Sequence, residues 1–239
     1  MKALSAYFSF DELPALLRGD TVSTCAGTER MDRHRIGCWL TILIVGSALY
    51  GAAIGAWRVP LQAFYTAVKL PLVILLTTLG NALLNGMLAP LLGVNLGFRE
   101  SLRAVLLSFT VASVLLGGFA PLLLFVVWNT PQLHTSLAEA LPAYRFMQLL
   151  VVAGIACAGV VGNVRLLPLI RLRAANERAA LRVLFAWLAG NLFLGSQICW
   201  VLRPFIGRPL DSVTFFSAYP WEGNFFETIF QAFRMVFFQ

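Results

Sequence analysis

The chain has 239 residues, of which 59% are hydrophobic and 12% are charged. About a quarter of the residues of an ordinary soluble domain are charged, and one soluble core cannot bury this much apolar surface, so the composition excludes that class. The formal net charge is +7, and because the basic residues flank apolar blocks, we attribute them to contact with anionic lipid and expect no nucleic-acid partner.

Residues 1–35 are predicted to form a cytoplasmic N-terminal segment. From Ser9 to Arg18, apolar residues recur at helical spacing, which indicates a short amphipathic helix against the membrane, with a frayed terminus as the alternative. The basic run RMDRHR ends the segment directly before the first apolar block, as is typical of a cytoplasmic flank. The segment carries five acidic residues and no apolar core, so it does not resemble a secretory signal peptide.

Five apolar blocks follow, each long enough to cross a bilayer as a helix. The predicted spans cover about residues 36–57, 70–93, 104–128, 147–164 and 183–202. The expected fold is therefore all-α: a five-helix integral membrane bundle over residues 36–202, with amphipathic interfacial segments at both ends. Residues 58–69 are expected to connect the first two spans. Residues 165–182 hold five arginines around an apolar run and are predicted to lie at the membrane interface.

Residues 203–239 are predicted to be an interfacial aromatic tail. Asn224 can cap a helix that places Phe226, Phe230 and Phe233 on one face. Because Glu227 and Arg234 interrupt this stretch, we expect a membrane-surface helix and no sixth crossing. A protein-docking helix is the alternative.

The distribution of basic residues predicts the topology. The N-terminal segment, the link between spans two and three and the link between spans four and five carry 5, 2 and 5 of the 18 Lys and Arg. By the positive-inside rule, this places the N-terminus in the cytoplasm and the C-terminus outside. The expected location is a bacterial cytoplasmic (inner) membrane.

Polar residues within the predicted spans are mostly uncharged. No ionisable Asp, Glu, Lys, Arg or His lies well inside a span, which argues against a proton pump or an ion-coupled carrier. Asn81 and Asn85 share one face of the second span, and Asn191 and Gln197 lie on the fifth. These amides either line a polar path or join helices by hydrogen bonds, and the missing charges favour the second interpretation.

Small residues recur every four positions on two spans. They are Ser47, Gly51 and Gly55 on the first span and Gly154, Ala158 and Gly162 on the fourth. Such stripes let helix backbones approach closely. We predict packing within the bundle, although packing against another subunit would use the same pattern.

At the end of the fifth span, Trp200, Arg203 and Phe205 are candidate anchors for lipid or a partner. Pro204 removes a backbone donor, so the chain is expected to turn there. Arg203 can bind a phosphate or carboxylate with two hydrogen bonds, or simply extend to the interface. Arg203 with Asp211 and Glu222 is the one polar cluster that a lipid-processing enzyme could use.

Motifs for catalysis or cofactor binding are missing from the sequence. It contains no nucleotide-binding loop and no zinc-hydrolase or serine-hydrolase motif, so neither an enzyme nor a cofactor is expected. The four cysteines form no CxxC pair, and His34 and His134 are predicted on opposite faces of the membrane. A shared metal or haem site is therefore not expected.

Three short segments carry a resemblance to a known group. YTAVKLP at 65–71, WVLRPFIG at 200–207 and NFFE at 224–227 are similar to a family of uncharacterised bacterial multi-pass membrane proteins, over most of the chain after Arg35. The resemblance implies the membrane fold and no established activity. In layout, the chain also resembles the Yip1 family, whose members organise membrane traffic by binding small GTPases.

These observations predict a non-enzymatic scaffold or accessory subunit of a membrane complex. Its expected partners are membrane lipids, with anionic headgroups on the cytoplasmic side, and a membrane protein or a second copy of the chain. The alternative is a small-molecule or ion permease that works as an oligomer.

Overall fold

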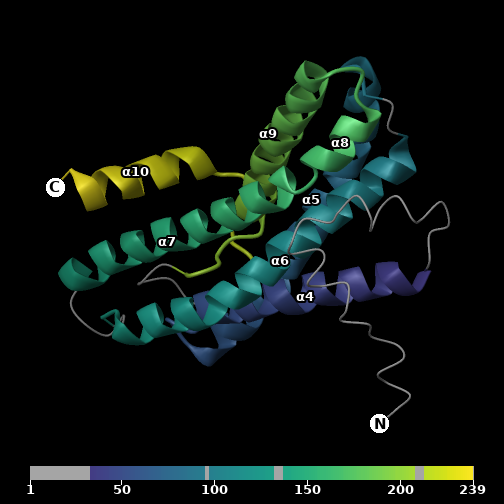
Figure 1. The fold of residues 1–239 in the computed structure, drawn as a ribbon. Helices are drawn as coiled ribbons and strands as arrows, with labels where there is room; N and C mark the ends of the chain where they lie inside the picture. Colours follow the sequence, from purple (N-terminus) through teal and green to yellow (C-terminus); the bar gives the residue numbers. More distant parts are fainter. Residues whose placement is uncertain (1–32, 95–96, 132–136, 208–212, 239) are drawn as a thin grey trace, which may run out of the picture.

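The computed structural model describes residues 33–94, 97–131, 137–207 and 213–238. Within these ranges the regular elements are helices (Figure 1): α4 (Arg33–Gly55), α5 (Pro60–Leu91), α6 (Phe98–Asn129), α7 (Leu137–Val164), α8 (Leu167–Arg173), α9 (Glu177–Val201) and α10 (Phe225–Phe237). The helix predicted from Ser9 to Arg18 lies outside the described residues.

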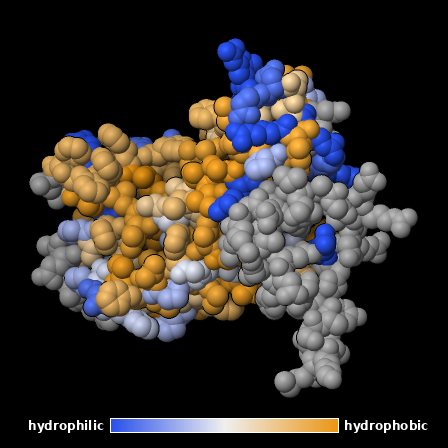
Figure 2. Space-filling view, in the orientation of Figure 1, coloured by the Kyte–Doolittle hydropathy of each residue, from blue (hydrophilic) through white to orange (hydrophobic). Residues whose placement is uncertain are grey.

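The prediction of five membrane-spanning helices is confirmed. Helices α4, α5, α6, α7 and α9 are each long and apolar enough to cross a bilayer. Large apolar side chains such as Leu79, Phe185 and Phe193 are exposed on their outer faces, where lipid would contact them. Figure 2 shows this apolar surface over most of the molecule, with the hydrophilic residues gathered mainly at one end. The chain is therefore a multi-pass α-helical membrane protein.

All five spanning helices begin before their predicted first residues. The differences are largest at α5, which begins at Pro60, and at α7, which begins at Leu137. The prediction of a connection over residues 58–69 was therefore wrong. Proline suits the first turn of a helix because its missing N–H would be unpaired there in any case. The polar Gln62, Thr66 and Lys69 in this first part of α5 are buried against the rest of the chain. Residues 60–69 have the composition of a link, but burial against the rest of the chain stabilises them as the start of a helix.

The two small-residue stripes face other helices of the same chain. A Cβ atom at Gly51 would overlap the Thr66 carbonyl oxygen, and one at Gly55 would overlap the Gln62 carbonyl oxygen. Ser47 is fully buried and donates a hydrogen bond of 2.6 Å to the Leu43 carbonyl. The first stripe therefore lets α4 and α5 pack backbone to backbone.

The second stripe packs α7 against α4 and α6. Gly154 lies against the Tyr50 hydroxyl, Ala158 is fully buried, and a Cβ at Gly162 would overlap the Ser108 carbonyl oxygen. Since both stripes are used inside the chain, they hold the bundle together.

The links between helices gather at two ends of the bundle. At one end, Val94 and Ala174 form an isolated β-bridge, Ala175 donates to the Gly93 carbonyl at 3.3 Å, and Arg173 pairs with Glu100 at 3.0 Å. These contacts join the link after α5 to the link around α8, so the two basic links meet at one end. At the other end, the Trp57 indole N–H donates to the Pro131 carbonyl at 3.3 Å.

The close contact at Gly162 yields a prediction about stability. Gly162→Ala should lower the free energy of unfolding by about 1–3 kcal/mol, because the new methyl group overpacks against Ser108. Gly159 has nothing within 4 Å of an added Cβ, so Gly159→Ala should raise stability by about 0.5–1 kcal/mol through helix propensity. Thermal unfolding of both variants in the same detergent compares them. Equal shifts of the same sign would contradict the packing described here.

Candidate functional site

The chain leaving α9 is held by three side chains of α5. Gln62, Thr66 and Lys69 lie on one face of that helix and are fully buried. The Gln62 amide donates to the Phe205 carbonyl at 2.6 Å and to the Pro204 carbonyl at 3.2 Å. The Thr66 hydroxyl also donates to the Phe205 carbonyl, at 2.9 Å. These bonds satisfy carbonyls that no longer have a helical partner beyond Val201.

The ammonium group of Lys69 completes this contact. Its Nζ donates to the Pro204 carbonyl at 2.8 Å, and it lies 4.8 Å from the centre of the Phe215 ring and 5.7 Å from that of Phe205. Aromatic ring faces attract a cation most strongly where water is excluded. Lys69 therefore binds the segment after α9 through a carbonyl and two rings, and Phe205, a predicted anchor, contacts this lysine.

Arg203 organises the turn before α10. Its guanidinium donates to the carbonyls of Tyr219 and Glu222 at 2.7 Å each and to those of Trp200 and Pro220 at 3.2 Å each. It also stacks 3.9 Å from the centre of the Trp200 ring. Because four backbone carbonyls engage these donors, Arg203 acts here as a structural connection within the chain.

Trp200 takes part in the same turn. Its indole N–H donates to the Glu222 carbonyl at 3.1 Å, and its ring lies against Gly223, whose φ of +77° favours glycine. Asn224 follows and caps α10, as its side chain accepts from the Phe226 N–H at 3.0 Å. Residues 65–71, 200–207 and 224–227 thus converge on one region. Of the other residues weighed for a lipid enzyme, Glu222 contributes its backbone carbonyl and Asp211 lies outside the described residues.

The tail helix α10 lies alongside α7 (Figure 1). Ala232 is fully buried, and Ile229 and Val236 on the same side are half-buried. The phenylalanines of a second face are exposed: Phe226, Phe230, Phe233 and Phe237. A third face carries Glu227, Gln231 and Arg234. The helix thus attaches by aliphatic side chains and presents its aromatic face outward.

The intramembrane amides come together between α5, α7 and α9. Asn81 packs on Gly190, and Asn191, the next residue of α9, donates to the Asn163 Oδ1 of α7 at 2.8 Å. Asn163 donates in turn to the Gly159 carbonyl at 2.8 Å. Three of the four predicted amides, Asn81, Asn85 and Asn191, therefore belong to this region, whereas Gln197 lies further along α9 and is half-buried.

Sequence reasoning missed two members of this amide region. Asn163 falls at the last turn of its predicted span, and Trp187 reads as an ordinary apolar residue of α9. Both are buried. No spacing in the sequence connects either of them to Asn81, because they belong to other helices.

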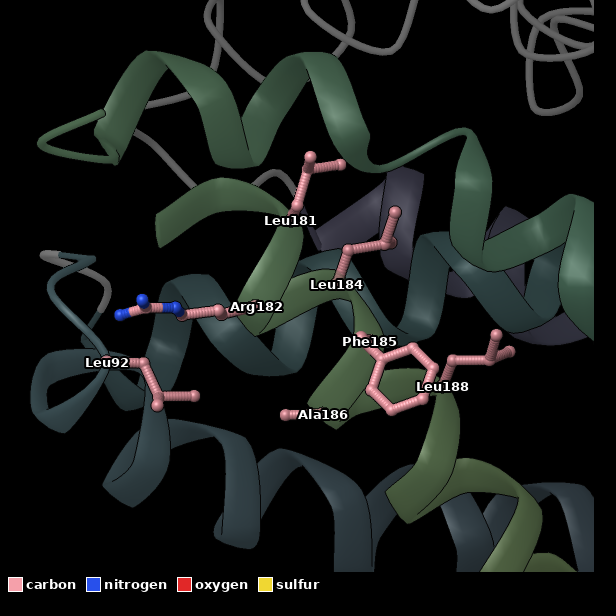
Figure 3. Close-up of a pocket in the computed structure, with 7 residues that line it drawn as sticks. All are labelled: Leu92, Leu181, Arg182, Leu184, Phe185, Ala186 and Leu188. Carbon is pink, nitrogen blue, oxygen red and sulfur yellow. The ribbon is translucent and has the colours of Figure 1, made fainter. Parts of the chain in front are cut away.

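The basic end of the bundle carries an open apolar groove next to an arginine. The groove has a volume of about 540 Å³ and is lined by α9 side chains and by the end of α5 (Figure 3): Leu92, Leu181, Arg182, Leu184, Phe185, Ala186 and Leu188. The Arg182 side chain extends past Leu92, away from Phe185 and Leu188 (Figure 3). The apolar groove therefore has the positively charged Arg182 side chain at one edge.

Two arginines of this end are held by acidic groups. Arg171 donates to both Glu177 carboxylate oxygens, at 3.0 and 2.9 Å from its Nε, and Arg173 pairs with Glu100. Arg178 and Arg182 project from the first turns of α9 and are exposed. The Asn176 side chain caps α9 by accepting from the Ala179 N–H at 2.9 Å. The helix start and both arginines therefore present positive charge at the same end.

The fold and these sites define the chain as a multi-pass α-helical membrane protein with one basic end and one end rich in aromatic residues. It matches no protein-family model, no curated protein and no solved structure. In the described part of the chain, no group of three or more His, Cys, Asp or Glu is placed to hold a metal ion.

The Arg203 contacts yield a prediction. Arg203→Lys should destabilise the turn over residues 217–222 by about 1–3 kcal/mol, because a lysine cannot reproduce the planar fork that reaches several carbonyls. Limited proteolysis should then cut between α9 and α10 faster than in the native chain. Arg234→Lys, an exposed change on α10, is the matched control. Equal cleavage rates in the native chain and both variants would contradict the role given to Arg203.

Proposed function

We propose that the protein is a non-enzymatic scaffold or accessory subunit of a membrane complex, and that it binds anionic lipid at its basic end. The basic end lies on the cytoplasmic side of a bacterial inner membrane in this proposal, with the C-terminus outside. The gathering of arginines at that end carries the proposal.

The charge balance at the basic end supports binding of anionic headgroups. The links after α5 and around α8, with the first turns of α6 and α9, hold seven arginines: Arg99, Arg103, Arg165, Arg171, Arg173, Arg178 and Arg182. Glu100 and Glu177 are the acidic residues of these same stretches. Each basic residue near an anionic membrane surface contributes roughly 1 kcal/mol of attraction. The excess also favours the cytoplasmic side for this end.

The groove supports the same proposal. A phospholipid combines an anionic phosphate with long acyl chains, and the groove combines Arg182 with the apolar side chains of Leu184, Phe185 and Leu188. Arg178 lies one helical turn before Arg182 on the same side of α9. A phosphate at these two arginines would leave an acyl chain free to follow α9 into the bilayer.

Aromatic side chains are consistent with a second membrane–water interface at the opposite end. Trp128, Tyr219 and Trp221 are all more than half exposed there, and tryptophan and tyrosine are enriched where a membrane meets water. The exposed phenylalanines of α10 lie on the same part of the molecule. We assign to this aromatic face the contact with a membrane-protein partner.

The lipid proposal predicts a loss of affinity on removing two charges. Arg178→Gln with Arg182→Gln should weaken binding of phosphatidylglycerol roughly thirtyfold, which corresponds to about 1 kcal/mol for each arginine. Native mass spectrometry of the gently extracted protein, titrated with that lipid, measures the change. The control pair, Arg145→Gln with Arg234→Gln, removes the same charge from the other end. Equal losses in both pairs would refute a site at the basic end.

One observation favours a second candidate function, permeation of a small uncharged solute through an oligomer. Asn81, Asn85 and Asn191 lie together between three helices, and such amides can replace the hydration of a passing solute. Glycerol flux into proteoliposomes, followed by light scattering, should then exceed that of empty liposomes. Asn81→Leu with Asn85→Leu should abolish the excess, whereas Asn129→Leu, an exposed change, should keep it. Native flux equal to that of empty liposomes would eliminate this candidate.

A further inference from the structure

The contacts between α5 and α9 define how the two helices are aligned. Thr77 packs on Gly195, Asn81 packs on Gly190, and Gly93 packs on Ala179. Residue numbers therefore decrease along α9 as they increase along α5, which means that the two helices run antiparallel. In this alignment Asn81 lies at the level of Asn191, and Asn85 lies at the level of Trp187. The two levels are separated by one helical turn, about 6 Å along the axis.

Five polar atoms at these two levels are buried without a hydrogen-bond partner in the described part of the chain. The donors are Asn81 Nδ2, Asn85 Nδ2 and Trp187 Nε1, and the acceptors are Asn81 Oδ1 and Asn191 Oδ1. Asn81, Asn85 and Trp187 are at most 1% exposed. Buried polar groups in folded proteins nearly always have a partner, because leaving one unpaired forfeits the hydrogen bonds that it made in water.

Neighbouring side chains do not supply these partners. The Asn191 amide N–H is committed to Asn163, and the Asn163 amide N–H is committed to the Gly159 carbonyl. Nearby hydroxyls are also engaged within their own helix: Thr77 donates to Val73 and Thr78 donates to Ile74, each at 2.7 Å. The five atoms therefore point to a bound molecule as their partner.

The atoms also define the chemistry of that molecule. None of the residues that carry them is charged, and acceptors stand beside donors, so neither an anion nor a cation is matched. Three N–H donors and two oxygen acceptors fit a molecule that both donates and accepts hydrogen bonds. Gly190 keeps α9 close to Asn81, since an added Cβ would lie 3.1 Å from Asn81 Oδ1. The occupant must therefore be small.

We propose that Asn81, Asn85, Trp187 and Asn191 form an intramembrane binding site for a small uncharged hydrogen-bonding molecule, either water or a solute of about the size of glycerol. A buried water typically makes about three hydrogen bonds, and as few as about two, to groups that are otherwise unpaired. The level of Asn81 and Asn191 holds three of the five atoms and the level of Asn85 and Trp187 holds two, so each level fits one such occupant. The site requires neither the lipid-binding role nor transport across the membrane.

The Trp187 indole N–H reports directly on the occupant. The full chain in lipid nanodiscs is labelled with ¹⁵N at its tryptophan indoles, and the Trp187 signal is assigned by its loss in Trp187→Phe. We expect a magnetisation-transfer peak between water and the Trp187 N–H. Titration with glycerol distinguishes the two sources: a saturable shift of the signal identifies a solute, and an unchanged water peak identifies water.

The result that overturns the proposal is measured on the native chain. A Trp187 N–H that shows no water contact and no response to glycerol would mean that the site is dry. Asn81→Leu with Asn85→Leu gives a second measurement. We expect it to lose the water or glycerol contact and to lower the thermal midpoint by several degrees, whereas Asn129→Leu keeps the contact. A higher thermal midpoint in the double variant would also overturn the proposal, because it would mean that the native amides are unpaired.

Discussion

Hydrogen bonds from Gln62, Thr66 and Lys69 to the carbonyls of Pro204 and Phe205 join the start of α5 to the segment after α9. A chain that leaves a helix near lipid has carbonyls without partners, and lipid offers no donor to replace them. The first three turns of α5 supply these donors. Because the segment after α9 is attached there, Arg203 can organise the next turn and α10 can lie along α7. The placement of the whole C-terminal region thus depends on this contact.

The interior of the bundle is held by a different kind of contact. Glycines in α4 and α7 bring backbones together at Thr66, Gln62 and Ser108, where side chains would keep them apart. Lipid tails are as apolar as the helix surfaces, so the hydrophobic effect does not drive helices together within a membrane. Dispersion between closely packed atoms is therefore a main source of attraction between them. The glycine contacts from α4 and the attachment of the segment after α9 therefore act at the same turns of α5, those of Gln62 and Thr66.

The two ends of the molecule differ in chemistry, which gives the proposed roles different locations. The basic end combines exposed arginines with an apolar groove, whereas the opposite end presents aromatic side chains on α10 and on the turn before it. The amide region lies between them, surrounded by three helices. A lipid-binding role and an uncharged binding site would thus occupy separate parts of one bundle and can be tested independently.

The sequence by itself determined the number of spanning helices and the composition of the two ends. A span is recognised from length and missing charge, which are local properties, and the spacing of Asn81 and Asn85 places them on one face for the same reason. Only the tertiary structure decided that α5 begins at Pro60, that Arg203 binds its own backbone, and that Asn81 lies level with Asn191. These features depend on which helices meet and at what register, and no periodicity along a single helix encodes that.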